Sequence, residues 1–300
     1  MNAMFLLTTP ITLTDIAAMA KAGANALLFG CEPFSVRCAG CFPLSQLAEI
    51  KKTCMAYHVE MSVAVNRFFS ETQLPQLQDF LVLLKELDVD GIYFSDEAVL
   101  AYGQALGITD KLIYQPDTLM TNHADVNFYL GEGIKRVVLA REITLEEILA
   151  IAKQCDPTRL EIIIHGYSTA MYSRRQLLSN YMKFLGWDRS LQKQRDLMIE
   201  EATRQERMPI YEDENGTHIF SVAVQQSFQE LECLSEAGIH TARIDGIFHS
   251  GKEICKVVEL YDQLRRKKID AETALSCYRE YFPVEPSDCG FYYRPTSTTK

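Results

Sequence analysis

Several features common in membrane and secreted proteins are missing from this 300-residue chain. No apolar run approaches the roughly 20 residues that a membrane-spanning helix needs. The N-terminal stretch MNAMFLLTTPITLTD has no basic segment before its short apolar run, unlike a signal peptide. We therefore expect a cytoplasmic protein that makes no membrane contact.

The chain also lacks the motifs of several enzyme classes. It contains neither a GxGxxG after its first predicted strand nor a GxxxxGK[ST], so the usual signatures of nucleotide-phosphate binding are absent. It contains no GxSxG and no HExxH, which removes two common hydrolase signatures. The formal net charge of −10 argues against nucleic-acid binding by the bare chain through overall charge, although a partner or a local basic patch could provide it.

Nothing in the cysteine pattern indicates a disulfide framework. The nine cysteines are odd in number and irregularly spaced, which favours reduced thiols. The single CxxC, at Cys38 and Cys41, is compatible with a redox pair or half of a metal site. Because no second CxxC accompanies it, two loop thiols are the favoured interpretation, and we predict no metal site.

What the chain does contain is an alternation of short apolar strands and amphipathic helices. Eight such strand–helix units in succession favour a (β/α)8 TIM-barrel-like α/β fold over an open doubly wound sheet. We predict a single barrel-like domain over residues 1–282. The expected strands are 5–7, 26–29, 60–65, 91–94, 111–114, 136–140, 159–164 and 241–244.

The alternation is interrupted after the seventh strand, which is expected to break at His165-Gly166. An insertion at about 176–220 begins with a charged, helix-prone segment over 176–205. It ends with Asn215-Gly216 between β-prone runs, a strong hairpin signal. Basic and aromatic residues alternate in the insertion, which fits RNA contact or, equally, a solvated helix face packed on a partner. A C-terminal helix and a polar tail over 283–300 close the chain.

In a barrel, the residues that follow the strands build the functional face. We assign catalytic roles to polar residues at three strand ends and substrate-binding roles to the polar residues at the other strand ends. Residues in these positions also commonly form ion pairs at the rim of the barrel or cap helices. The candidate catalytic residues are His165, Tyr167, Asp117 and Glu142. The candidate substrate-binding residues are Arg37, Asn66, Asp96, Gln115, Asn122, Arg141, Tyr172, Ser173, Arg243 and Asp245.

Two of these assignments have specific chemical reasons. His165 could act as an acid, a base or a ligand, although a lone histidine is more often a hydrogen-bonded structural residue. Arg37, Arg141 and Arg243 would clamp a small carboxylate, because guanidinium forks match carboxylates.

Several motifs together resemble the collagenase-like peptidase family U-32, over nearly the full chain. They are RVVLAREITLEEI (Arg136–Ile148), YQPDTLMTN (Tyr114–Asn122), LEIIIHGYSTAMYSRRQLLSNY (Leu160–Tyr181), LSEAGIHTARIDGIFHS (Leu234–Ser250) and DCGFYY (Asp288–Tyr293). The family's domain is barrel-like.

The sequence departs from the family pattern at several positions. Thr169 and Gln176 stand where family members carry cysteines that in several cases bind an iron–sulfur cluster. Ile247 replaces the arginine of a Glu-Gly-Arg pattern. The resemblance therefore implies a chain that holds neither an iron–sulfur cluster nor another cofactor of its own.

Three functions remain open on these grounds. The resemblance favours the cluster-less subunit of a prephenate-dependent tRNA uridine 5-hydroxylation system, with prephenate as a small-molecule substrate. Its partner would be a larger cysteine-containing homologue or a second copy, and tRNA would bind through the complex. The alternatives are a collagenase-like peptidase (a hydrolase) that uses Cys38, Cys41 or a serine after His165, and a non-catalytic scaffold.

Overall fold

Eight parallel strands close into a barrel in the computed structural model, which describes residues 4–200, 202–203 and 206–294. Each strand pairs with the next around the barrel, and β12 pairs with both β1 and β8 to close it. The barrel predicted from the sequence is confirmed. Its strands are β1 Phe5–Thr8, β2 Ala26–Cys31, β4 Glu60–Val65, β5 Gly91–Phe94, β6 Leu112–Tyr114, β7 Arg136–Val138, β8 Leu160–Ser173 and β12 Thr241–Ile244.

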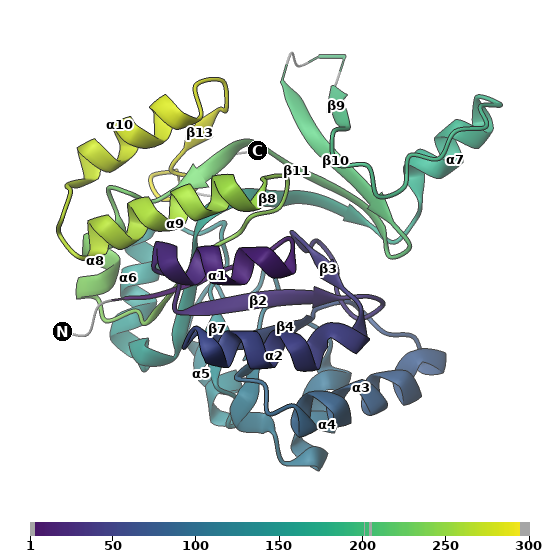
Figure 1. Ribbon diagram of the computed structural model, residues 1–300, viewed down its shortest axis with the longest axis horizontal. Coiled ribbons are helices and arrows are strands. Elements are labelled where there is room, and N and C mark those ends of the chain that lie inside the picture. Colours follow the sequence, from purple (N-terminus) through teal and green to yellow (C-terminus); the bar gives the residue numbers. More distant parts are fainter. Residues whose placement is uncertain (1–3, 201, 204–205, 295–300) are drawn as a thin grey trace.

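Helices cover the outside of the barrel (Figure 1). A capping box starts one of them at Thr144: Glu147 N donates to Thr144 Oγ1 over 3.2 Å, and Thr144 N donates to the Glu147 carboxylate over 2.7 Å. The helices are α1 Leu13–Ala22, α2 Leu47–Ala56, α3 Leu74–Glu86, α4 Glu97–Leu106, α5 His123–Gly131, α6 Leu145–Gln154, α8 Leu231–Glu236, α9 Gly251–Arg265 and α10 Ala271–Tyr281.

Two apolar layers hold the barrel together. Outward-facing strand residues pack under the helices in the main core, whereas a second cluster that includes Leu28, Ala64 and Ile163 fills the barrel interior. A polar group lies within that interior: Glu161 accepts hydrogen bonds from Tyr93 Oη (2.6 Å) and Arg136 Nε (2.9 Å). Both hydrogen bonds go to Glu161 Oε2, and the ion pair with Arg136 offsets part of the cost of burying the two charges.

The seventh barrel strand does not break where the sequence suggested. β8 continues through His165 and Gly166 to Ser173, because its far half pairs antiparallel with β11 (Gly216–Gln226). Gly166 takes a φ of +121° and lies against the backbone of Asp245, a close approach that leaves no room for a Cβ atom. The glycine therefore bends the strand away from the barrel without ending it.

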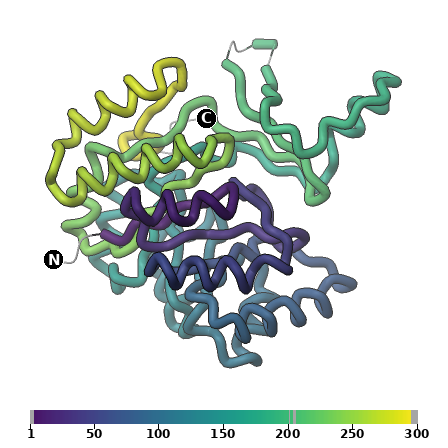
Figure 2. Tube along the Cα trace, viewed as in Figure 1, coloured from purple at the N-terminus to yellow at the C-terminus, as the bar shows by residue number. Residues whose placement is uncertain are grey.

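The insertion forms an arm that projects from the barrel (Figures 1 and 2). We call residues 174–213 the arm; it contains α7 (Leu177–Phe184), β9 (Met198–Glu200) and β10 (Arg207–Asp213). The helix is shorter than the segment expected from helix propensity, of which residues 201, 204 and 205 lie outside the described part. The predicted hairpin is confirmed, with Asp213 paired to Gly216 across the turn.

The C-terminal segment returns to the barrel after α10. β13 (Ser287–Asp288) pairs with β11, and Tyr292 O accepts a hydrogen bond from Leu145 N at the start of α6 over 3.0 Å. Residues 295–300 of the predicted tail lie outside the described part. Within the described ranges, no helix combines the length and the hydropathy needed to cross a bilayer.

Candidate functional site

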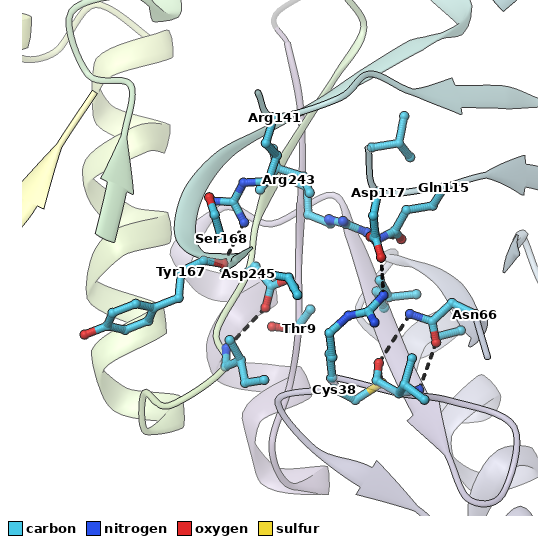
Figure 3. A pocket seen from close by; sticks show the side chains of 18 of the residues that line it. Thr9, Cys38, Asn66, Gln115, Asp117, Arg141, Tyr167, Ser168, Arg243 and Asp245 are labelled. Atoms are coloured by element: carbon cyan, nitrogen blue, oxygen red, sulfur yellow. Dashed lines mark hydrogen bonds and ion pairs between the residues drawn. The ribbon is translucent and has the colours of Figure 1, made fainter. Parts of the chain in front are cut away.

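A narrow pocket of about 70 Å³ opens at the carboxyl ends of the barrel strands (Figure 3). Side chains from the loops after most of the barrel strands and from β8 and β11 line it. Nine sequence-predicted site residues are among them. They are Arg37, Asn66, Gln115, Asp117, Arg141, Glu142, Tyr167, Arg243 and Asp245.

Arg141 is a half-buried cation whose hydrogen-bond partners are uncharged. Its guanidinium donates to the carbonyl oxygens of Gly166 (2.6 Å) and Tyr167 (2.7 Å) and to Gln225 Oε1 (3.2 Å). Burial lowers its pKa to about 10; nearby Asp245 opposes that shift and nearby Arg243 adds to it. Because guanidinium carries five N–H donors, two remain without a partner among the described residues.

Arg243 rises from β12 inside the barrel and is almost fully buried. Its Nη1 donates to Gln115 Oε1 over 2.8 Å, and its Nε lies 3.8 Å from Glu161 Oε1 without a hydrogen-bond partner. Glu161 is already bonded to Arg136, so one carboxylate faces two guanidinium groups. The floor of the pocket is therefore electropositive.

An ion pair between Arg37 and Asp117 joins the loops after β2 and β6 across the pocket. Both residues adopt left-handed backbone conformations, with φ of +54° and +62°. Non-glycine residues rarely occupy this region, and holding one there costs on the order of 1 kcal/mol or more. The pairing therefore fixes two strained loop positions at the mouth.

The other lining candidates have mainly local partners. The Asn66 amide exchanges hydrogen bonds with the backbone of Val36 (3.0 and 3.3 Å), and Asp245 Oδ1 accepts from Ile247 N (3.2 Å). Glu142 lies at the exposed rim. The ring of Tyr167 points away from the other labelled side chains in Figure 3, and its hydroxyl donates to Glu285 over 3.3 Å.

His165 does not line the pocket. Its ring is fully buried and packs against Phe228, Tyr261 and Tyr278, with centroid separations of 6.2, 5.8 and 5.2 Å. Burial, with smaller contributions from His249 and Arg141, lowers its pKa well below the ordinary value. His165 is thus a neutral core residue, which was the structural alternative considered from the sequence.

Four other candidates lie outside the pocket lining. Asp96 and Asn122 are N-caps: Asp96 accepts from Ala98 N (2.9 Å), and Asn122 accepts from Ala124 N and Asp125 N (both 3.0 Å). Tyr172 and Ser173 lie further along β8, beyond the barrel. There Tyr172 stacks on His218 with a centroid separation of 4.7 Å.

Thr9, Phe220 and Cys38 are among the lining residues that were not assigned to the pocket from the sequence. Thr9 Oγ1 accepts a hydrogen bond from Gly246 N over 2.8 Å. Because Thr9 directly follows β1, the rule that residues after the barrel strands build the functional face (the strand-end rule) would have found it. Phe220 reaches the pocket from β11, which local sequence could not indicate. Cys38 also lines it, and a hydrogen bond with Cys41, together with burial, raises its pKa well above the ordinary value.

Comparison with known proteins identifies the family to which these features belong. The family model described as peptidase family U32 matches residues 12–294. "tRNA hydroxylation protein P2" of Bacillus subtilis is 30% identical over 97% of this chain and 98% of its own length. "tRNA hydroxylation protein P1" of the same organism is 27% identical over 84% of this chain, which spans 60% of that longer protein.

More distant similarities agree on the fold. "23S rRNA 5-hydroxycytidine C2501 synthase" of Escherichia coli is 23% identical over 90% of this chain and 41% of its own length. The solved structure of the U32 peptidase Mk0906 superposes with a TM-score of 0.51 and 12% identity, covering 81% of this chain and 92% of that one. At that identity the superposition supports the barrel fold alone.

Proposed function

Since the chain belongs to peptidase family U32, we propose that it is a subunit of a cytoplasmic tRNA uridine 5-hydroxylation system whose pocket binds an anionic small molecule such as prephenate. The observation that carries the proposal is the pair of guanidinium groups at the barrel mouth, that of buried Arg243 and that of half-buried Arg141. It occurs in a chain whose near-full-length relative is named as a tRNA hydroxylation protein.

The electrostatics of the pocket favour a carboxylate ligand. The nearby Arg243 adds to the lowering of the Arg141 pKa, and Arg141 has no directly bonded carboxylate among the described residues. An anion placed between them would offset that repulsion. A planar carboxylate also matches the N–H fork that Arg141 leaves free.

The size of the pocket sets a condition on the ligand. A volume of about 70 Å³ is small beside the roughly 300–1,000 Å³ typical of ligand sites, and it suits one carboxylate group rather than a whole ring-bearing acid. Binding prephenate therefore requires the Arg37–Asp117 pair to open. The strained backbone of both residues lowers the cost of that opening.

The residues present do not fit an iron–sulfur cluster. Such clusters are usually held by four cysteine thiolates, whereas Cys38 is the one thiol among the residues that line the pocket. Among the described residues no group of three or more potential ligands could hold a metal ion. We assign any cluster chemistry to a larger, cysteine-containing homologue bound to this chain, with a homodimer as the alternative assembly.

The peptidase alternative gains no support from the pocket. Among the described lining residues, no serine, threonine or cysteine side chain is hydrogen-bonded to a histidine or a carboxylate. His165, the candidate base for a serine nucleophile, is fully buried among aromatic side chains and does not line the pocket. A serine nucleophile is weak unless an adjacent base activates it.

Titration of prephenate into the purified chain tests the proposed site. Arg141→Lys keeps the charge but removes the fork, and we expect it to weaken binding about tenfold or more. Arg159→Lys is the matched control, because Arg159 also donates to backbone carbonyls, those of Leu130 and Ile134, but precedes β8 at the opposite end of the barrel. Absence of binding at millimolar prephenate, or equal losses in both variants, would contradict the proposal.

A further inference from the structure

The first part of the arm, residues 174–195, concentrates positive charge in an otherwise acidic chain. Residues 174–195 contain six basic residues and one acidic residue, Asp188, whereas the whole chain has a formal net charge of −10. The arm also projects from the barrel (Figure 2), so this charge is displayed away from the acidic remainder. Local charge of this kind attracts polyanions even when the net charge of the protein does not.

Two of the six basic residues attach the arm to the barrel mouth. Lys193 pairs with Glu32 (2.8 Å) and Glu214 (3.4 Å), and Arg195 donates to Cys38 O (2.8 Å). The remaining four form no ion pair with any residue in the described part of the chain. They are Arg174, Arg175, Lys183 and Arg189.

Large aromatic side chains are exposed among these free cations. Tyr181, Phe184 and Trp187 have 55%, 84% and 61% of their surface accessible, and they lie on α7 or directly after it. A monomeric domain gains nothing by exposing three such rings within seven residues. Flat rings between cations are a surface on which unpaired bases stack.

A buried carboxylate holds the arm in a fixed orientation. Glu212 is fully buried and accepts hydrogen bonds from Leu178 N (2.7 Å), Ser179 N (3.0 Å) and Thr217 Oγ1 (2.8 Å). These contacts satisfy the free N–H groups at the start of α7. The exposed rings are therefore carried by a positioned helix.

The basic and aromatic surface continues from the arm to the pocket. Arg67 lies near Tyr172 and Arg174. Burial lowers the pKa of Arg67, Arg174 adds to that shift, and Tyr172, Asp213 and Glu214 oppose it. The Arg37 guanidinium, which lines the pocket, lies 5.9 Å from the ring centre of Tyr172 on β8. Tyr172 and Arg37 therefore link the base of the arm to the pocket.

We propose that the arm, together with Tyr172, Arg37 and Arg67, is an RNA-binding surface that takes an unpaired stretch of tRNA and directs one base to the pocket. The inference rests on the proposed function. Exposed rings and arginines also occur at protein interfaces, but four cations without partners would there be left uncompensated unless the partner were acidic. The phosphates of RNA supply that compensation along the whole surface.

The test measures binding of fluorescein-labelled bacterial tRNA to the full chain by anisotropy between 50 and 200 mM salt. The triple variant Arg174→Glu, Lys183→Glu, Arg189→Glu reverses three free cations of the arm. We expect its affinity to fall at least about tenfold and its log–log salt slope to decrease by about 2. Trp187→Ala should weaken binding about fivefold with an unchanged salt slope, because it removes stacking alone.

The matched control reverses three exposed lysines elsewhere: Lys52→Glu, Lys252→Glu, Lys268→Glu. It changes the net charge equally and should leave affinity within about twofold if local contacts dominate. Equal losses in both triple variants, or no tRNA binding by the wild-type chain at 50 mM salt, would overturn the proposal. So would an arm variant that binds tRNA normally but no longer co-purifies with the larger homologue, since that result makes the arm a protein interface.

The two proposals fail in different ways. If a strain lacking this gene keeps its hydroxylated uridine, the proposed function fails whatever the arm binds. If the strain loses it and the arm variants restore it fully, the function stands and the RNA-binding arm is rejected. Circular dichroism melting of each variant excludes unfolding as the cause of a loss.

Discussion

At the scale of single residues, His165 shows how position decides chemistry. An imidazole after a buried strand looked like a catalytic group, yet its ring packs among Phe228, Tyr261 and Tyr278. Arg141, by contrast, is a half-buried cation that lines the pocket and leaves donors for a ligand. Sequence alone could not separate these two cases, because both follow apolar strands and differ only in which way the side chain turns.

Replacing His165 should affect stability rather than ligand binding. His165→Ala removes a buried ring from an aromatic cluster, so we expect the free energy of unfolding to fall by about 3 kcal/mol. Urea unfolding measures this change, and calorimetric titration measures prephenate affinity of the folded variant. A tenfold loss of prephenate affinity in the folded variant would contradict this prediction and assign His165 to the ligand-binding site.

Buried histidines should also make the protein sensitive to acid. Burial lowers the pKa of His218 to about 3, whereas the unfolded chain titrates near 6.5. Because the unfolded state binds the proton first, the stabilisation is complete above pH 6.5 and decreases as pH falls toward the folded-state pKa. For His218 alone the loss is about 2 kcal/mol at pH 5.

Urea unfolding at pH 7.5 and pH 5 measures that loss. His218→Phe keeps a ring stacked on Tyr172 and should reduce the difference between the two pH values by about 2 kcal/mol. The exposed His123→Gln serves as the control and should leave it unchanged. Asp213 and Glu230, whose pKa values burial raises, act in the opposite direction, so the comparison between variants isolates the histidine. An equal pH dependence in wild type and His218→Phe would contradict the account.

At the scale of elements, the strand-end rule identified most of the polar residues that line the pocket, but it also included residues that lie outside it. It predicted Arg37, Gln115 and Arg243 correctly as neighbours, because parallel strands must deliver their ends to one face. It failed for Asp96 and Asn122, which cap the helices that follow them. An acidic or amide residue directly before a helix is itself a capping signal, so that failure was avoidable.

The arm was less predictable for a physical reason. β8 continues past Gly166 only because β11, some 50 residues later, supplies its hydrogen-bond partners. Such a long-range pairing leaves no local signal, and the glycine resembled a strand end. The hairpin turn was predictable, since its residues carry the required backbone conformations themselves.

The base of the arm provides a prediction at this scale. Glu212→Gln replaces one acceptor oxygen with an N–H donor facing the N–H groups of Leu178 and Ser179. We expect α7 to open locally, with hydrogen exchange over 177–184 increasing about tenfold, a cost of about 1.5 kcal/mol. The barrel strands should exchange as before. Unchanged exchange in α7, or faster exchange throughout the barrel, would show that Glu212 does not act as a local anchor.

At the scale of the whole molecule, the chain combines two guanidinium groups at the pocket and a basic segment, residues 174–195, with an acidic body. The net charge of −10 disfavours indiscriminate RNA binding, which is consistent with the local RNA-binding surface that we propose. The thiols do not fit a cluster, so the assembly we propose divides the chemistry between two homologous subunits. This chain then binds the small anion and guides the RNA.

The most direct test of this account is mass spectrometry of tRNA nucleosides from cells that lack this gene and carry no redundant paralogue. We predict that nucleosides derived from 5-hydroxyuridine disappear, and that wild-type and Arg159→Lys copies restore them. An Arg141→Lys copy, expressed at the same level, should not restore them. An unchanged nucleoside profile in the deletion strain, or full restoration by Arg141→Lys, would contradict the account.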